Sequence, residues 1–467
     1  MKRITFALLA GCLMLTPPAW GKKTKEKPKP VEEQAIAAEP VAPPPVKTKM
    51  LELPEAQRIA LQGNPGIGAA QARIEQAKAK IKQVIASQQP SVDVVANLGA
   101  QSDQEGEISE NSSLGLQASW LLFDGYARKF QQEQAEYGEK SSAAAKRNSQ
   151  RLLIAAVADA FFNAQLAKTS IEIAAGDQEF YEQQLKDAQH RFQAGTGSWG
   201  DVLNIRVQVN SAKNSVISAQ RQHEAARYGL SALLGVEDSA LPELSELDKK
   251  FNPPDDSMAV NTETLISEAL KNRPDVKKLT LQIKGAEAGV QQAEAQNSPK
   301  VQVKGQAGAV SQKNLFPESD DIGASVGLSL SWNLYSGGAV EAAAMEARQA
   351  KREAAYGYAD LRNSITAEIK QDAALLVAAA KLVRLQQESV DLVKENRKLA
   401  QSEYEAGASS LVRLNEAQRD LTTTYGRLAQ AVVAYHQARH QLLAAAGKNL
   451  EPFTDLLEVQ VKTPKVE

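Results

Sequence analysis

The sequence of 467 residues contains one pattern twice. Pro65 recurs as Pro274 at an offset of 209 residues, and Trp120 recurs as Trp332 at an offset of 212. A duplication of this length means that one supersecondary unit is built twice, with each copy packed beside the other. Any element that the first half forms is therefore expected in the second.

Composition narrows the kind of unit that is repeated. The chain is 43% hydrophobic but only 5% aromatic, which favours long, closely packed helices over compact globules. Its 54 basic and 56 acidic residues are mixed along the chain and give a net charge of -2. Because no basic surface stands out, we expect no nucleic-acid partner.

The N-terminus has the layout of a bacterial secretory signal. Arg3 precedes an apolar run from Ile4 to Leu15, and Ala19-Trp20-Gly21 supplies small residues for cleavage. The only cysteine, Cys12, lies in a Leu-Ala-Gly-Cys sequence typical of lipoproteins, so lipidation is the alternative to ordinary cleavage. No later apolar stretch reaches roughly 18 residues, so membrane entry would require a closed barrel.

Four segments alternate apolar and polar residues with the period of two that is typical of strands. They lie at about 91–98, 113–122, 300–309 and 325–334, joined by polar loops at 102–111 and 311–322. About ten residues suffice for a tilted strand to cross a bilayer. A half-buried sheet in a soluble protein is the competing interpretation. Trp120 and Trp332, at matching ends of their strands, favour a membrane barrel with interfacial aromatic residues.

Helical patterns occupy most of the rest of each copy. We expect helices over about 54–86 and 264–295, very long proline-free helices over 127–193 and 339–405, and returning helices over 200–234 and 411–446. Each long helix would span roughly 100 Å. Gly195, Gly197 and Gly407 lie in the turns where the chain reverses.

These patterns divide the chain into six parts. They are a signal peptide (1–21), a Pro- and Lys-rich disordered leader (22–49), the first repeat (50–235), a loop-rich junction (236–262), the second repeat (263–447) and a C-terminal tail (448–467). Four strands per chain are too few to close a barrel, and an open edge in lipid leaves backbone groups unpaired. The chain is therefore expected to oligomerise, and three copies would supply twelve strands.

The sequence resembles the TolC-like outer-membrane channel family. The resemblance covers about residues 50–447 and rests on the duplication and on four stretches: Leu-Pro-Glu-Ala-Gln-Arg-Ile-Ala-Leu-Gln-Gly-Asn-Pro at 53–65, Trp-Leu-Leu-Phe-Asp-Gly-Tyr at 120–126, Gly-Thr-Gly-Ser-Trp-Gly-Asp-Val-Leu-Asn at 195–204 and Trp-Asn-Leu-Tyr-Ser-Gly-Gly at 332–338. It implies an α+β membrane protein: a trimeric, 12-stranded outer-membrane β-barrel continued by a long periplasmic α-helical barrel in a Gram-negative bacterium.

The resemblance also implies a function and partners. Such homotrimers passively conduct drugs, toxins, metals or proteins outward, docked to a periplasmic adaptor protein and an inner-membrane pump of the RND, ABC or MFS type. A structural or adhesive outer-membrane coiled-coil protein without a pore is the alternative. The cargo is not readable from the sequence.

Family members often carry acidic residues just after the hairpin tips, where the channel entrance closes. The matching positions are Asp201 and Asn204 in the first copy and Arg413 and Glu416 in the second. Arg413 departs from the acidic pattern. Three interpretations stay open: an acidic gate ring, a mixed ring held by arginine–carboxylate pairs, and ordinary solvated helix surface.

Other candidate chemistry is sparse, and we expect no catalysis, cofactor or metal. His436 and His440 share a helix face, but two histidines without a third ligand are better interpreted as surface or packing residues. His190 and His223 are isolated. Acidic loop residues are interpreted as solvated rather than cation-binding: Asp103, Glu105, Glu107, Glu110, Glu318, Asp320 and Asp321.

Overall fold

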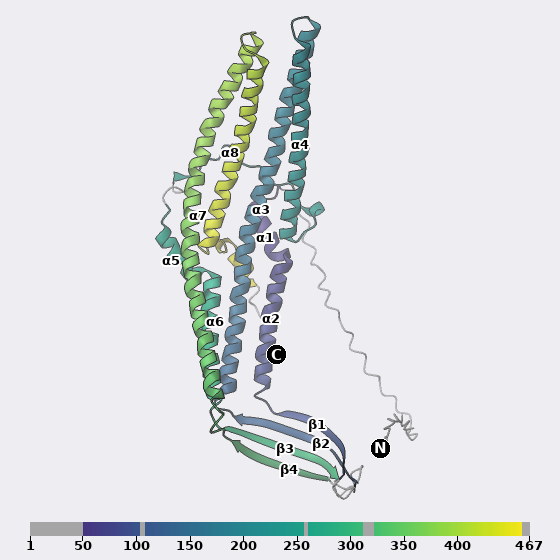
Figure 1. Cartoon of the computed structure of the whole chain (residues 1–467), viewed down its shortest axis with the longest axis vertical. Helices are drawn as coiled ribbons and strands as arrows, with labels where there is room; N and C mark the ends of the chain where they lie inside the picture. Colours follow the sequence, from purple (N-terminus) through teal and green to yellow (C-terminus); the bar gives the residue numbers. More distant parts are fainter. Residues whose placement is uncertain (1–49, 103–107, 256–259, 312–321, 460–467) are drawn as a thin grey trace, which may run out of the picture. The chain divides into compact units, whose positions relative to one another are not determined.

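A computed structural model describes residues 50–102, 108–255, 260–311 and 322–459. Each copy forms two short helices, a strand hairpin and a hairpin of two long helices (Figure 1). The first copy comprises α1 (Leu53–Gly63), α2 (Pro65–Ala86), β1 (Ser91–Ser102), β2 (Ile108–Phe123), α3 (Ala127–Gln193) and α4 (Trp199–Leu234). The second comprises α5 (Thr262–Asn272), α6 (Pro274–Ala295), β3 (Lys300–Ser311), β4 (Ile322–Ser331), α7 (Ala339–Glu405) and α8 (Leu411–Ala445). The predicted long helices are confirmed.

The prediction of one continuous helix at the start of each copy is wrong. Each is two helices, broken at Asn64 before Pro65 and at Arg273 before Pro274. Proline disfavours the helical conformation of the residue before it, and both residues are extended, with ψ of 120° and 129°. The two prolines then serve as the first residues of α2 and α6.

The four strands form one antiparallel sheet in the order β1-β2-β3-β4. Its register aligns side chains in rows, and successive residues point to opposite faces. One face is apolar and largely exposed, with Val94, Leu116 and Leu328 at 73%, 53% and 71%. The other face is mainly polar or Gly: the row Ser91–Ser119–Lys304–Gly327 lies beside the row Asp93–Gln117–Gln306–Ser325.

Two predicted strand ends need correction. The alternating pattern continues to Leu334, yet β4 ends at Ser331, because Ser331 pairs with Lys300 and β3 begins there. Beyond that point the edge strand has no neighbour. By contrast, β2 begins at Ile108, within the predicted loop, because β1 extends to Ser102 and pairs with it.

The helices pack in a row. Helix α3 contacts α4, α2, α6 and α8, whereas α7 contacts α8, α6 and α5. The largest apolar cluster joins both copies, and includes Phe161 of α3, Ile365 of α7 and Tyr435 of α8. Helices α4 and α7 are therefore the outer long helices of the row. Among the described helices, none combines the length and the apolar character that crossing a membrane requires.

The segment between the short helices caps the long returning helix of the same copy. In the first copy, the Asn64 amide donates to the carbonyl oxygen of Leu233 at 2.9 Å. In the second, the Arg273 guanidinium donates to the carbonyl oxygen of Ala445 at 3.0 Å. Leu233 and Ala445 are equivalent at the offset of 212. Each cap thus joins the end of α4 or α8 to the start of α2 or α6.

The junction and the C-terminal tail pack against different apolar clusters. Leu244 of the junction joins the largest cluster, and the Leu51–Leu244 bridge ties it to the start of the first copy. Phe453 of η4 (Glu451–Phe453), before α9 (Thr454–Val459), packs instead with Leu61 and Ile154. A short η1 (Asp238–Ala240) completes the junction.

Candidate functional site

The two helical hairpins reverse through matching turns. Gly195 and Gly407 adopt φ of 75° and 74°, which residues with a side chain rarely tolerate. Ser198 then caps α4 by accepting the N–H of Gly200 at 3.0 Å, and Ser410 caps α8 by accepting that of Arg413 at 3.4 Å. These caps fix the start of each returning helix, and the four candidate gate residues lie in its first two turns.

Of the four candidate gate residues, Arg413 forms an ion pair in the structure, and the other three differ in exposure. Asn204 and Glu416 are exposed, and Asp201 is half-buried. Arg413 pairs with Glu403 of α7 at 3.6 Å, within its own hairpin. The Arg413–carboxylate contact of a single chain therefore joins α8 to α7, and Glu416 is not its partner.

The hairpin tips differ in their apolar contacts. Trp199, the first residue of α4, is 49% exposed and packs on Phe192, with ring centres 5.2 Å apart. Its equivalent Leu411 is 6% exposed and lies in a cluster with residues of α3 and α4. Tyr404 of α7 joins the same cluster, and Arg191 of α3 lies 4.7 Å from the centre of its ring. The second tip is thus anchored on the first hairpin.

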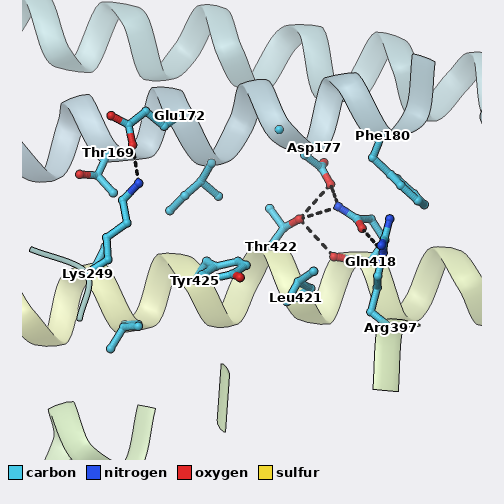
Figure 2. A pocket seen from close by; sticks show the side chains of 14 residues that line it. Thr169, Glu172, Asp177, Phe180, Lys249, Arg397, Gln418, Leu421, Thr422 and Tyr425 are labelled. Atoms are coloured by element: carbon cyan, nitrogen blue, oxygen red, sulfur yellow. Dashed lines mark hydrogen bonds and ion pairs between the residues drawn. The ribbon is translucent and has the colours of Figure 1, made fainter. Parts of the chain in front are cut away.

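Farther from the tips, a polar network joins the copies between α3 and α8 (Figure 2). Asp177 of α3 accepts from the Gln418 amide at 2.9 Å and from the Thr422 hydroxyl at 2.8 Å. Arg397 of α7 donates to the Gln418 amide oxygen at 3.2 Å and lies 4.8 Å from the ring centre of Phe180. We call these five residues the α3–α8 joint. Burial lowers the pKa of Arg397, but it remains a cation.

The joint borders a cavity of about 490 Å³ between α3 and α8. Ile173, Leu421 and Tyr425 give it apolar walls, and the Lys249–Glu172 ion pair lies at the end away from Arg397 (Figure 2). The α3–α8 contact is therefore incompletely packed at this level and is held by hydrogen bonds.

The α3–α8 joint could not be predicted from the sequence. Asp177 and Gln418 are 241 residues apart and belong to different copies, so no local spacing links them. The duplication identifies which elements correspond, but the register between α3 and α8 depends on packing. Arg273 was missed for the same reason: besides Asp275, its partners lie on α7 and α8.

Both tryptophans of the sheet region make the same hydrogen bond. The Trp120 indole donates to the carbonyl oxygen of Gln88 at 2.9 Å, and that of Trp332 donates to Asn297 at 3.0 Å. Gln88 and Asn297 follow α2 and α6, and both indoles remain exposed, at 44% and 60%. Each tryptophan thus ties the end of a strand to the helix–strand connection of its own copy, with the rest of its ring free.

The remaining candidates are structural or lie outside the described residues. His436 stacks on Phe162 with ring centres 4.8 Å apart, and His440 lies beside the same ring. No group of three potential metal ligands occurs within the described ranges. Cys12 and the acidic residues at 103–107 and 318–321 lie outside them, and Glu110 belongs to β2.

The family model of the outer membrane efflux proteins matches residues 57–236 and 265–448. The chain belongs to this family. It is 25% identical over 393 residues to nodulation protein T of Rhizobium leguminosarum bv. trifolii, covering 81% of this chain and 82% of that protein. It is 26% identical to the alkaline protease secretion protein AprF of Pseudomonas aeruginosa, covering 64% and 62%. The CmeC outer membrane channel of Campylobacter jejuni has the same fold, with a TM-score of 0.74, 17% identity and coverage of 87% and 89%.

Membership confirms the main expectations from the sequence. This outer membrane efflux protein is an export channel of the Gram-negative outer membrane with a large periplasmic helical part. The fold of four strands per chain, with long helices built from a tandem repeat, is likewise confirmed.

Proposed function

We propose that three copies of this chain form a closed conduit: a twelve-stranded barrel in the outer membrane, continued by a tunnel of helices. The observation that carries the proposal is that, in a single chain, both the sheet and the row of long helices end in edges without a neighbour. Strands β1 and β4 are the edge strands of the sheet, and helices α4 and α7 are the outer long helices of the row. Edges that meet between copies leave no backbone group unpaired in lipid.

Outer helix α7 supports this closure with an exposed leucine seam. Leu385, Leu392 and Leu399 recur every seven residues and are 59%, 62% and 54% exposed. Outer helix α4 exposes Leu203 and Ile217, at 46% and 57%. Heptad-spaced apolar residues are typical of helices that pack on a partner helix.

The duplication supplies the register of that contact. At the offset of 212, α7 corresponds to α3 and α4 corresponds to α8, so the α3–α8 contact is the template for α7 against α4 of the next copy. Asn415 and Ala429, the equivalents of Leu203 and Ile217, are buried in the chain, at 7% and 4% exposed. Within the chain, Asp177 of α3 contacts Thr422 of α8. Their equivalents at the same offset are Ser389 of α7 and Asn210 of α4, so we expect Ser389 to contact Asn210 of a neighbouring copy.

A cysteine cross-linking experiment tests the ring. Oxidation of the Asn210→Cys/Ser389→Cys variant should yield covalent trimers on a non-reducing gel, because the two residues approach only between copies. The matched control, Asp177→Cys/Thr422→Cys, should form its disulfide within a chain and run as a monomer. Monomers alone from both variants would contradict the proposed assembly.

Conduction is tested by planar-bilayer recording of the purified protein. Open channels, or channels that open under applied voltage, are expected. A cross-linkable trimer that never conducts would support the structural alternative.

We propose further that the tips form the periplasmic entrance, with Asp201, Asn204, Arg413 and Glu416 as gate residues and Gly195, Gly197 and Gly407 in the turns. Arg413, paired with Glu403, would stiffen its hairpin rather than neutralise Glu416. Replacing Arg413 and Glu416 by Ala should change single-channel conductance, and an unchanged conductance would defeat this assignment. Trp120 and Trp332 are proposed to lie at the membrane interface, contacting outer-membrane lipid.

As partners we propose a periplasmic adaptor at the tips and an inner-membrane pump of the RND, ABC or MFS type. One observation supports this: the relative AprF is named for the secretion of a protease. Co-purification of a periplasmic adaptor protein with the tagged channel from cell extracts is the direct check. We also propose that the channel works without a cofactor.

A further inference from the structure

The polar face of the sheet carries an excess of positive charge. Ser91 and Ser119 share a hydrogen bond of 2.9 Å between their side chains, which places both on one face. Ser119 pairs in register with Lys304, so Lys304 lies on that face too. Lys300 lies four residues earlier on β3. It lies on the same face, because side chains alternate between the two faces along a strand.

The two lysines have no carboxylate partner among the ion pairs of the described residues, and both are exposed. Asp93 is the one acidic side chain described on this face. It lies on β1, two strands and one row from Lys304, which corresponds to about 12 Å. That distance is too long for an ion pair, so each chain contributes two separate positive charges and one separate negative charge.

The opposite face shows which side meets lipid. Val301 and Val303 alternate with the lysines and pair with Leu330 and Leu328, in the apolar and exposed layer. A barrel in a membrane turns its apolar face outward and its polar face toward the water-filled bore. In the trimer proposed above, on which this inference rests, six lysines and three aspartates would line the bore.

We propose that this bore attracts anionic solutes, and that Lys300 and Lys304 are the residues responsible. The solute class is small or polymeric molecules bearing carboxylate, phosphate or sulfate groups. Charges of one sign in a narrow aqueous passage raise the local concentration of opposite ions. In water, a lysine about 10 Å from a monovalent ion changes the local concentration of that ion about twofold.

The electrostatic potential near the two lysines can be measured with a reporter cysteine. Ser119→Cys places a thiol opposite Lys304, and its rates of modification by an anionic and a cationic methanethiosulfonate reagent are compared in low salt. Each charge acts in opposite directions on the two reagents, so replacing both lysines by Gln in this background should lower the anionic-to-cationic rate ratio about sixteenfold, which is about fourfold for each lysine. Asp93→Asn should raise the ratio about fourfold, and added salt should shrink both effects.

Controls separate this inference from the assembly on which it rests. A second reporter, Ser409→Cys in the α7–α8 turn, should keep its rate ratio when the lysines are replaced. A Ser119→Cys thiol that reacts with both reagents at a ratio insensitive to Lys300 and Lys304 overturns the charge inference and leaves the bore intact. A thiol that reacts with neither reagent in folded trimers, but reacts after unfolding, overturns the water-filled bore itself.

Discussion

The two copies cap the same backbone position by different chemistry. In the first, the neutral Asn64 amide makes a single hydrogen bond to the end of α4. In the second, the guanidinium of Arg273, 4% exposed, bonds the end of α8, Asp275 at 2.8 Å and Glu368 of α7 at 2.6 Å. Burial raises the pKa of Asp275, but its hydrogen bonds with Arg273 outweigh this and hold the pKa below its ordinary value.

The comparison shows that the two copies share backbone features at this position but not the capping side chain. Both copies keep the helix break before a proline and a left-handed glycine after the long helix, Gly235 and Gly447, with φ of 70° and 74°. The side chain that caps the end of the returning helix differs between the copies. In the second copy it also reaches α7, and Arg151 of α3 lies 3.6 Å from Asp275, so the ionic cap joins the two copies.

The largest expected effect comes from removing each cap. Arg273→Ala should lower the free energy of unfolding by about 3–5 kcal/mol, because it leaves the partly buried Asp275 without its main partner. Asn64→Ala should cost about 1 kcal/mol, the loss of one neutral hydrogen bond. Urea unfolding in detergent, followed by circular dichroism, measures both. Equal losses would show that the two caps are energetically the same.

The tips give the next largest contrast. Leu411→Ala should destabilise the second hairpin by about 2–4 kcal/mol, since it opens a cavity in a packed cluster. Trp199→Ala should cost less than about 1 kcal/mol in a single chain, because half of that side chain is already exposed. Hydrogen exchange at the two turns reports each loss. Faster exchange in the Trp199 variant than in the Leu411 variant would reverse this ranking.

The two copies should also differ in their response to acid. Burial and the charge of Arg439 lower the pKa of His436 and His440 to about 4, and the equivalent residues of α4 are Glu224 and Tyr228. The unfolded chain takes up these protons near pH 6.5 and the folded chain only near pH 4. The stability from neutral histidines is therefore complete above about pH 6.5 and is lost as the pH falls toward 4.

We expect a loss of about 1–2 kcal/mol per histidine across that window, allowing for partial exposure. Urea midpoints at a series of pH values measure it. The His436→Phe/His440→Phe variant should have a flatter profile between pH 5 and 6.5. An identical slope in the variant would assign the acid sensitivity to other groups.

The smallest contrast lies at the start of the long helices. Tyr126 adopts φ of 69° where the second copy has Gly338, at 85°. Gly338→Ala should therefore cost about 1 kcal/mol of backbone strain. Tyr126→Gly should gain less than about 1 kcal/mol, because it relieves strain but loses the ring contact with Phe123 at 5.7 Å. Melting temperatures should move in opposite directions, and a fall in both would show that the Tyr126 ring contacts outweigh the strain.

The sequence predicts those parts of the fold that local pattern determines. Proline-free helical stretches ending at Gly195 and Gly407 suffice to place α3 and α7. The breaks at Pro65 and Pro274 were also readable, since proline restricts the preceding residue. The end of β4 was not, because the alternation runs on past Ser331 and only pairing with β3 terminates the strand. The α3–α8 joint depends on the register of helices from different copies, which no local pattern encodes.

The caps at Asn64 and Arg273 have an electrostatic consequence for the tunnel. Each places the negative C-terminal end of one helix against the positive N-terminal end of the next, so that the peptide dipoles of α4 and α2, and of α8 and α6, run in series. Helices α3 and α7 run in the opposite direction beside these pairs. The backbone dipoles therefore largely cancel around the wall, and a passing solute experiences the field of the side chains rather than that of the helices.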